Sequence, residues 1–366
     1  MSGHRESSDV AVVGGGAIGL ACARAAAAAG ARVVVVDAGE PGAWHVAAGM
    51  LAPVSEAEFG EHALLRLGLE SAARYPAFCA ELEDPGYRPV GTLVVARDRD
   101  EAEALDRLAA FRRSLELPVS RLRPSQARAL EPALAPTIRL ALDIESDHSI
   151  DPRKLVAALA RGVDVRREWA RGLRVSGSRV TGVECDGGVI LAGQVVVAAG
   201  VWVDRLALPE FARIPVRPVK GVVLRLRDPR GAGLVERTIR GERAYLVPRG
   251  DGRYVLGATM EDRGWDTTPT AGGVYELLRD LSEVVPGVFE LELVELTAGL
   301  RPATPDNLPA IGHGALDGLV WATGHFRNGI LLTPVTAELV AGALAGERLP
   351  EWAAAADPLR FAGVPA

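Results

Sequence analysis

The residues whose spacing best suits chemistry lie near the N-terminus, at Gly14, Gly16 and Gly19. They follow the apolar run 10–13 and fit the pattern G-x-G-x-x-G, in which glycines allow a tight turn, close approach to a pyrophosphate and helix–strand packing. Asp37 stands 18 residues after Gly19, where a carboxylate can accept hydrogen bonds from ribose hydroxyls and repel a 2′-phosphate. The pattern therefore predicts a site for FAD or NAD rather than for NADP.

These glycines need a strand, a helix and a second strand to position them. The run 10–13 predicts a strand that is buried on both faces. The alanine-rich stretch 18–29 predicts a helix that ends at Gly30 in a left-handed conformation, and 32–36 predicts the next strand. The N-terminus of the helix then faces the phosphates of the dinucleotide.

Two further segments favour a flavin over a nicotinamide. Small residues fill 42–51, where they permit close approach of the backbone to a ligand. A strand over 319–323 runs into Gly324 and is followed by His325 to Gly329 and an apolar helix that ends near Leu344. If the start of this helix faces the N1/C2 edge of the ring, its dipole would stabilise an anionic reduced flavin.

Composition excludes several classes of function. The chain has 366 residues, a formal net charge of −6 and no basic block, which disfavours nucleic-acid partners. Neither of its two lysines completes a Walker A loop, and neither a G-x-S-x-G nor an H-E-x-x-H motif occurs. The three cysteines form no C-x-x-C pair and the histidines have no metal-ligand spacing, so we expect no metal. We expect a cytoplasmic protein without a secretory signal or membrane span.

The rest of the chain predicts a second unit. Residues 154–160 predict a helix with Asp151 as its cap, and 194–197 predict a buried strand. The segments 215–227 and 243–260 alternate apolar and polar residues, as antiparallel strands with one wet face do. We expect the tail after Pro350 to be loosely ordered.

Five segments together carry a family resemblance: AAGML at 47–51, AYLVPR at 244–249, GATM at 257–260, AGLRPAT at 298–304 and GHFRNGIL at 324–331. Over nearly its whole length the chain resembles the glycine oxidases of thiamine biosynthesis, within the D-amino-acid oxidase group of flavoproteins. The resemblance implies an α/β fold in which a Rossmann-like FAD-binding domain is interleaved with an antiparallel-sheet α+β substrate domain. It places the FAD-binding domain at 1–84, 141–213 and 297–366, and the substrate-binding domain at 85–140 and 214–296.

The resemblance also implies the site residues. Arg301 would hold the carboxylate of the substrate, with Tyr245 and Arg327 nearby, because a planar guanidinium presents parallel donors to a carboxylate. The residues implied to contact FAD are Gly14, Gly15, Gly16, Ala17, Gly19, Asp37, Ala38, Ala43, Ala47, Ala48, Gly49, Met50, Gly172, Gly200, His325, Phe326, Arg327, Asn328, Gly329, Ile330 and Leu331. Ala303 and Thr304 offer no thiol for a covalent link, so we expect FAD to be noncovalent.

The implied reaction is hydride transfer from the α-carbon of glycine to flavin N5, which gives imine or glyoxylate, ammonia and hydrogen peroxide, for thiazole formation. Sarcosine and small D-amino acids are further candidate substrates, molecular oxygen is the expected acceptor, and a homo-oligomer is the expected assembly. No dedicated catalytic acid or base is required once the amine is neutral.

Other interpretations stay open at this point. Arg301 could be structural, Arg327 could pair with a carboxylate, and Tyr245 could be a core residue. Gly172 and Arg240 stand where relatives tend to have larger apolar and aromatic residues, so the size of the substrate is undecided. An amino-acid dehydrogenase with another acceptor and a non-catalytic flavin redox sensor are the alternative functions.

Overall fold

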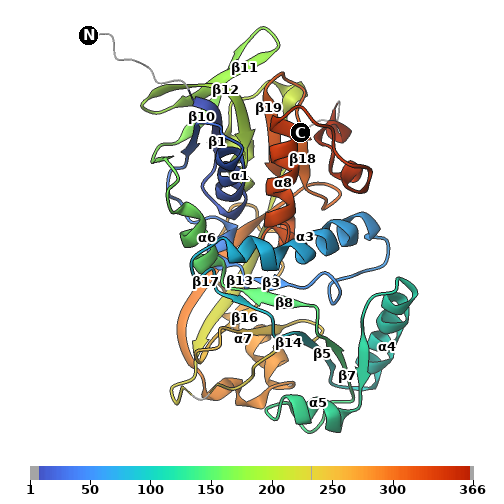
Figure 1. The fold of residues 1–366 in the computed structure, drawn as a ribbon. Helices are drawn as coiled ribbons and strands as arrows, with labels where there is room; N and C mark the ends of the chain where they lie inside the picture. The colour runs from blue at the N-terminus through green and yellow to red at the C-terminus, as the bar shows by residue number, and fades with distance from the viewer. Residues whose placement is uncertain (1–7, 232, 363–366) are drawn as a thin grey trace.

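The computed structural model describes residues 8–231 and 233–362, which form two large β-sheets with helices packed around them (Figure 1). The N-terminal residues 1–7, where we expect no secretory signal, lie outside the described residues. A small third sheet and helix α3 (His62–Ala80) lie between the two large sheets.

The first sheet has eight strands and a parallel centre in the order β9-β2-β1-β12-β19. Its strands are β1 (Ser8–Val13), β2 (Val33–Val36), β9 (Val165–Arg166), β10 (Ala170–Ser176), β11 (Arg179–Cys185), β12 (Gly188–Val197), β18 (Ala310–His313) and β19 (Leu319–Thr323). Residues 10–13 are buried, as expected for a strand covered on both faces. The predicted strands at 10–13, 32–36, 194–197 and 319–323 are thereby confirmed, although β1 already begins at Ser8 and β12 at Gly188.

Three helices pack together beside this sheet: α1 (Ala17–Ala28), α6 (Pro152–Ala160) and α8 (Thr333–Leu344). The predicted helix after the glycine turn is confirmed, and Gly30 has the left-handed φ of 93° that ends it. The Asp151 side chain caps α6 by accepting hydrogen bonds from the backbone N–H groups of Arg153 (3.0 Å) and Lys154 (3.4 Å), as predicted.

The second sheet also has eight strands, in the order β17-β13-β16-β15-β14-β5-β7-β6, and all its pairs are antiparallel except β14 with β5. They are β5 (Thr92–Ala96), β6 (Ser120–Leu122), β7 (Leu140–Ile144), β13 (Arg217–Arg227), β14 (Thr238–Arg240), β15 (Tyr245–Pro248), β16 (Arg253–Gly257) and β17 (Glu292–Ala303). Helices α4 (Arg99–Ser114), α5 (Pro124–Leu130) and α7 (Ala271–Ser282) lie in segments that connect strands of this sheet. The predicted antiparallel strands in 215–227 and 243–260 are confirmed.

The third sheet has the order β3-β8-β4, with β3 (Met50–Leu51), β8 (His148–Ile150) and β4 (Tyr87–Arg88). It joins the segment after the short helix α2 (Ala43–Val46) to the start of α6. The chain enters and leaves each large sheet more than once, so the predicted α/β class with two interleaved units is confirmed. The domain boundaries in residue numbers stay a prediction.

The expectation of a loosely ordered tail is wrong for the residues after Pro350 that the structure describes. Two 3₁₀ helices, Glu351–Ala356 and Pro358–Phe361, follow it. Ala353 and Ala356 are fully buried, and Arg360 forms an ion pair with Asp306 (2.8 Å). The small alanine side chains of this tail bury well because they pack against α3 and the first sheet.

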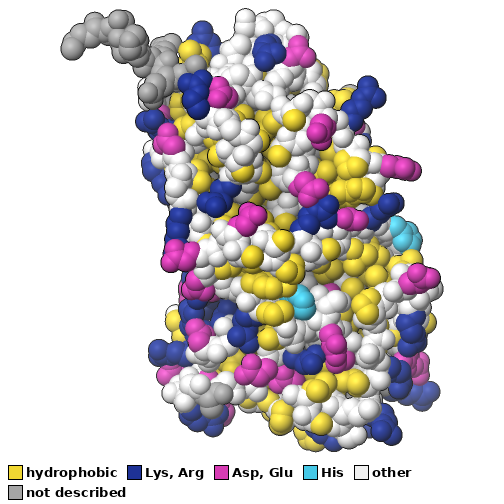
Figure 2. All heavy atoms as spheres, viewed as in Figure 1, with side chains coloured by type: hydrophobic (Ala, Val, Ile, Leu, Met, Phe, Trp, Pro, Cys, Tyr) yellow, Lys and Arg dark blue, Asp and Glu magenta, His cyan; other side chains and the backbone are white. Residues whose placement is uncertain are grey.

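The surface mixes charges of both signs. On the face drawn in Figure 2, basic and acidic side chains are interspersed, and hydrophobic atoms gather in patches across the middle of the molecule. Among the described residues, no helix is both long and apolar enough to cross a membrane.

Gly19 generates a prediction about the glycine turn. A Cβ atom there would lie 1.9 Å from the carbonyl oxygen of Gly14, so Gly19→Ala should lower the free energy of unfolding by about 1–3 kcal/mol through overpacking. The matched control is Gly272→Ala in α7, where a Cβ would meet no atom within 4 Å, and this change should be neutral or stabilising by up to about 1 kcal/mol. Urea unfolding of both variants measures the difference, and equal midpoints would contradict it.

Candidate active site

One large cavity of about 410 Å³ runs from the glycine turn of the first sheet to one face of the second sheet. It is lined by residues from distant parts of the sequence. Of the residues predicted for the site, those lining it are Gly14, Gly15, Gly16, Ala17, Asp37, Ala38, Ala43, Ala47, Ala48, Gly49, Met50, Gly200, Tyr245, Arg301, His325, Phe326, Arg327, Gly329 and Ile330. The fold thus brings nearly all the predicted residues to one place.

At the end of the cavity near the first sheet, the glycine turn lies close to the backbone that follows β12. Gly14 has a φ of 108°, and a Cβ there would lie 2.4 Å from the carbonyl oxygen of Ala198. Asp37 accepts hydrogen bonds from the backbone N–H groups of Gly15 (2.6 Å) and Gly39 (2.8 Å) and pairs with Arg167 (3.1 Å). The carboxylate is therefore fixed beside the glycine turn, as a ribose-binding acid requires.

Four predicted residues do not line this cavity. Gly19 packs under the turn, and a Cβ at Gly172 would lie 2.9 Å from the Cβ of Ala207. Asn328 and Leu331 instead line a small cavity beside α3 with Gly68 and Pro53. Any contact of these four with a cofactor stays a prediction.

Helix α3 holds the loop 325–331 in place. Ser71 donates a hydrogen bond to the carbonyl oxygen of Leu331 (2.6 Å), and Tyr75 donates one to that of Ile330. His325 is buried and contacts the hydroxyl of Thr336 (3.0 Å). Burial lowers its pKa to about 3, so His325 is neutral at physiological pH.

At the opposite end, on the second sheet, glycines lie in the strands beneath the side chains that line the cavity, and we call Gly221, Gly257 and Gly299 the glycine floor. Gly221 of β13 lies opposite Gly299 of β17, and Gly257 of β16 lies opposite Tyr245 of β15. A Cβ at Gly221 would lie 2.3 Å from Nη1 and Nη2 of Arg301, and one at Gly257 would lie 2.6 Å from the hydroxyl of Tyr245. The absence of side chains therefore lets the guanidinium and the phenol ring lie close over the sheet. Sequence reasoning did not find this glycine floor, because its members are far apart along the chain.

Arg301 is partly buried and is held by backbone oxygens. Its Nη1 donates to the carbonyls of Lys220 (3.1 Å) and Thr259 (3.2 Å). Among residues 8–231 and 233–362, no carboxylate lies within ion-pair distance of Arg301. Burial lowers the pKa of its guanidinium, an effect opposed by nearby Tyr245 and Glu56. A desolvated cation without an acidic partner favours an anionic ligand.

Tyr245 and Arg327 border the same end of the cavity. Burial raises the pKa of Tyr245, and the charge of Arg301 opposes that rise, so its hydroxyl stays protonated and can donate a hydrogen bond. Arg327 pairs with Glu61 at 3.0 Å, which is the ion pair that the alternative interpretation expected, although it also lines the cavity. Sequence reasoning missed Glu56 and Met260, which line the cavity as well.

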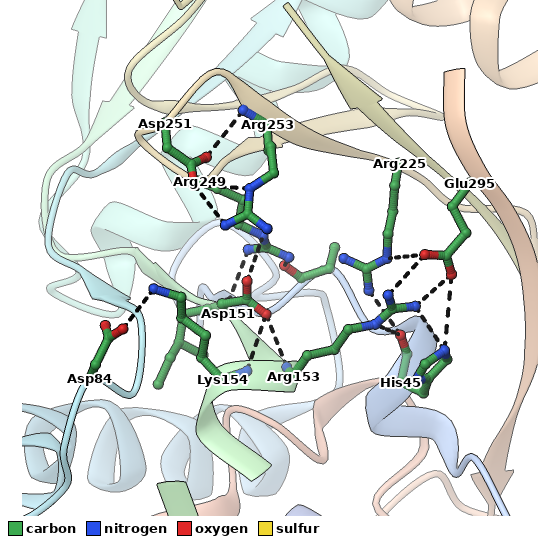
Figure 3. Close-up of polar contacts among 12 residues, drawn as sticks. His45, Asp84, Asp151, Arg153, Lys154, Arg225, Arg249, Asp251, Arg253 and Glu295 are labelled. Atoms are coloured by element: carbon green, nitrogen blue, oxygen red, sulfur yellow. Dashed lines mark hydrogen bonds and ion pairs between the residues drawn. The ribbon is translucent and has the colours of Figure 1, made fainter. Parts of the chain in front are cut away.

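Three arginines, two from the second sheet and one from α6, donate hydrogen bonds to the segment 43–50 or to its neighbour Ile150 (Figure 3). Arg249 donates to the carbonyl oxygens of Ala48 (2.8 Å) and Ile150 (3.1 Å). Arg225 and Arg153 both donate to the carbonyl oxygen of His45 (2.8 and 3.0 Å). Two carboxylates balance these cations: Glu295, which binds Arg153 through both oxygens (2.6 and 2.8 Å), and Asp151.

In the part of the chain that the structure describes, no group of three or more His, Cys, Asp or Glu side chains could hold a metal ion. None of the cysteines Cys22, Cys79 and Cys185 lines the cavity, and each is free.

Comparisons with known proteins define the class. The family model described as FAD dependent oxidoreductase (DAO) matches residues 9–343. The glycine oxidase of Geobacillus kaustophilus (strain HTA426) is 35% identical over 348 residues, which cover 91% of this chain and 92% of that protein. The crystal structure of glycine oxidase from Geobacillus kaustophilus has a TM-score of 0.89 and 34% identity, and it covers 97% of this chain and 99% of that chain.

A third relative is longer than this chain. The bifunctional protein ThiO/ThiG of Trichormus variabilis is 34% identical over 347 residues, which cover 91% of this chain and 52% of that protein. The chain thus spans about half the length of this curated relative.

The chain belongs to the DAO family of FAD-dependent oxidoreductases. The resemblance to glycine oxidases is confirmed by the same matches. The cavity also fits FAD: the glycine turn and Asp37 suit the adenosine and pyrophosphate, and Gly200, where a Cβ would meet no atom within 4 Å, leaves room for the ligand. Gly49, with a φ of 82°, lets the cavity wall pack against Ile150, whose carbonyl oxygen would lie 2.0 Å from a Cβ there.

The arginines behind the segment 43–50 generate a prediction. Arg249→Met removes two hydrogen bonds to carbonyls, including that of Ala48, which lines the cavity. We expect FAD to bind about 10-fold or more weakly, because hydrogen bonds from charged donors contribute about 1.5–3 kcal/mol each. Flavin fluorescence titration of the apoprotein measures the affinity, with the exposed Arg174→Met as the control. An unchanged affinity for FAD would show that the segment keeps its shape without Arg249.

Proposed function

We propose that the chain is a glycine oxidase that converts glycine, oxygen and water into glyoxylate, ammonia and hydrogen peroxide. One observation carries the proposal: the guanidinium of Arg301, without an acidic partner among the described residues, lies at the end of a cavity whose other end fits a dinucleotide. The Geobacillus glycine oxidase, similar over nearly the full length of both chains, supports the same activity.

Arg301 would bind the substrate carboxylate through the donors on Nη2 and Nε that the backbone carbonyls leave free, which suit a planar carboxylate. Tyr245 would donate its phenolic proton to the same group. The carbonyls of Lys220 and Thr259 keep the guanidinium from rotating, so the orientation of the bound amino acid is set before reaction.

Bound FAD supplies a two-electron acceptor, which no side chain of the chain provides. The residues of the chain need only orient the substrate. The substrate amine must be neutral when the α-hydrogen leaves, and solvent can take its proton, so we assign no acid or base. His325 is held neutral by burial and does not exchange a proton near pH 7.

We infer noncovalent FAD, because no cysteine lines the cavity within the described residues. A cytoplasmic homo-oligomer that serves thiazole formation in thiamine biosynthesis is the setting that the resemblance implies. Size-exclusion chromatography with light scattering tests the assembly, and a monomer at micromolar concentration would contradict it.

The direct test is anaerobic bleaching of the flavin by glycine, followed by peroxide production in air. An oxidase bleaches and forms one peroxide for each glycine consumed. Bleaching without peroxide would show a dehydrogenase with another acceptor, and neither would show a redox sensor.

Arg301→Met provides the mutational prediction. Removal of the guanidinium should weaken glycine binding by about 100-fold or more, because loss of one partner of a desolvated charge pair costs about 2–5 kcal/mol. FAD content should stay as in the unmodified protein. The exposed Arg174→Met is the matched control. Anaerobic titration of flavin absorbance gives the affinity, and an unchanged value would overturn the assignment of Arg301.

A further inference from the structure

An ion pair borders the substrate end of the cavity beside Tyr245. Arg240 of β14 lies directly opposite Tyr245 of β15, so the two side chains share one face of the second sheet. Nη1 of Arg240 lies 2.6 Å from Oε1 of Glu56, and their side chains are only 21% and 17% exposed. Both residues line the cavity. We call them the Arg240–Glu56 pair.

Buried groups fix the backbone that carries Glu56. The carboxylate of Asp147 accepts hydrogen bonds from the N–H groups of Val54 (3.1 Å) and Ser55 (2.6 Å). Arg112 donates to the carbonyl oxygen of Ser55 (2.6 Å). Asp147 and Arg112 are both buried, so the position of Glu56 is built into the fold rather than left to a mobile loop.

The charges at this end of the cavity are nearly all paired. Three arginines that line it have a carboxylate partner: Arg240 with Glu56, Arg327 with Glu61, and Arg243 with Glu242. Among the described residues, two lining arginines have no carboxylate partner: Arg205, which lies over the ring of Trp265 (4.3 Å), and Arg301. On the face of the second sheet that carries Tyr245, Arg301 is therefore the one lining arginine left to bind a carboxylate.

We propose that the Arg240–Glu56 pair restricts the substrate to amino acids with a single carboxylate. The inference rests on the proposed function and names its substrate class. A second carboxylate that approached Arg240 would meet a guanidinium already neutralised by Glu56, and it would lose its hydration without gaining a counter-charge.

Glu56→Gln keeps the size of the side chain and frees the cation of Arg240 inside the cavity. A ligand with two carboxylates could then bind Arg301 and Arg240 together. This gain of binding is not expected from a merely structural role, for which every ligand would bind more weakly.

The experiment compares two acids that differ by one carboxylate and do not react. Butyrate and glutarate are titrated into the FAD-loaded protein, and their dissociation constants are read from the change in flavin absorbance. In the unmodified protein we expect butyrate to bind at least as tightly as glutarate. In Glu56→Gln the preference should move toward glutarate by about 10-fold or more, because a bond between a guanidinium and a carboxylate is charge-assisted.

Two further variants control the result. Glu290→Gln removes the same charge at an exposed position that does not line the cavity, and it should leave the preference unchanged. Arg240→Met, alone or added to Glu56→Gln, removes the cation, so no gain for glutarate should appear. If Glu56→Gln does not fold, Arg240→Met still tests the pair, because the unbalanced Glu56 should weaken glutarate more than butyrate.

The possible outcomes separate this inference from the proposed function. Tight glutarate binding by the unmodified protein, or an unchanged preference in Glu56→Gln, would overturn the role of the pair. Neither outcome concerns glycine oxidation, which the bleaching and peroxide assays test alone.

Discussion

The partly buried guanidinium of Arg301, which has no acidic partner in residues 8–231 and 233–362, is the constraint on which the rest of the site depends. Removing a charge from water is costly unless hydrogen bonds or a counter-charge replace the lost hydration. The protein supplies two backbone carbonyls to Arg301 and leaves its remaining donors toward the cavity. A bound carboxylate would complete this arrangement, which is why the site selects an acid.

The glycine floor positions Arg301, and the arginines that hold the segment 43–50 support the cofactor end of the cavity. Gly221 lets the guanidinium lie flat on the sheet. The strand that carries Tyr245 runs on into Arg249, which binds the carbonyl of Ala48 in the cavity wall. β15 and the residue that follows it thus contribute Tyr245 to the substrate end of the cavity and support the part of the wall that contains Ala48.

The local parts of the fold could be predicted from the sequence, and the parts that depend on register could not. The G-x-G-x-x-G turn, the helix after it and the cap at Asp151 arise from neighbours in the chain, and the structure has them where expected. Gly221, Gly257 and Gly299 come together only through strand pairing across the second sheet, and a glycine in a strand looks like a weak strand former when read alone. Glu56 was missed for a similar reason, because its partner Arg240 is 184 residues away. The ordered tail was missed because burial of small alanines leaves no clear periodic pattern.

The central claim is that the glycine floor sets Arg301 to receive the substrate carboxylate. The most direct measurement is the affinity of FAD-loaded Gly221→Ala for glycine, obtained by anaerobic titration beside Gly272→Ala. A Cβ at Gly221 would displace the guanidinium while leaving its charge in place. The account predicts that Gly221→Ala binds FAD normally and glycine at least about 10-fold more weakly, since misplaced charge-assisted hydrogen bonds are largely lost. Unchanged glycine affinity in Gly221→Ala would contradict it.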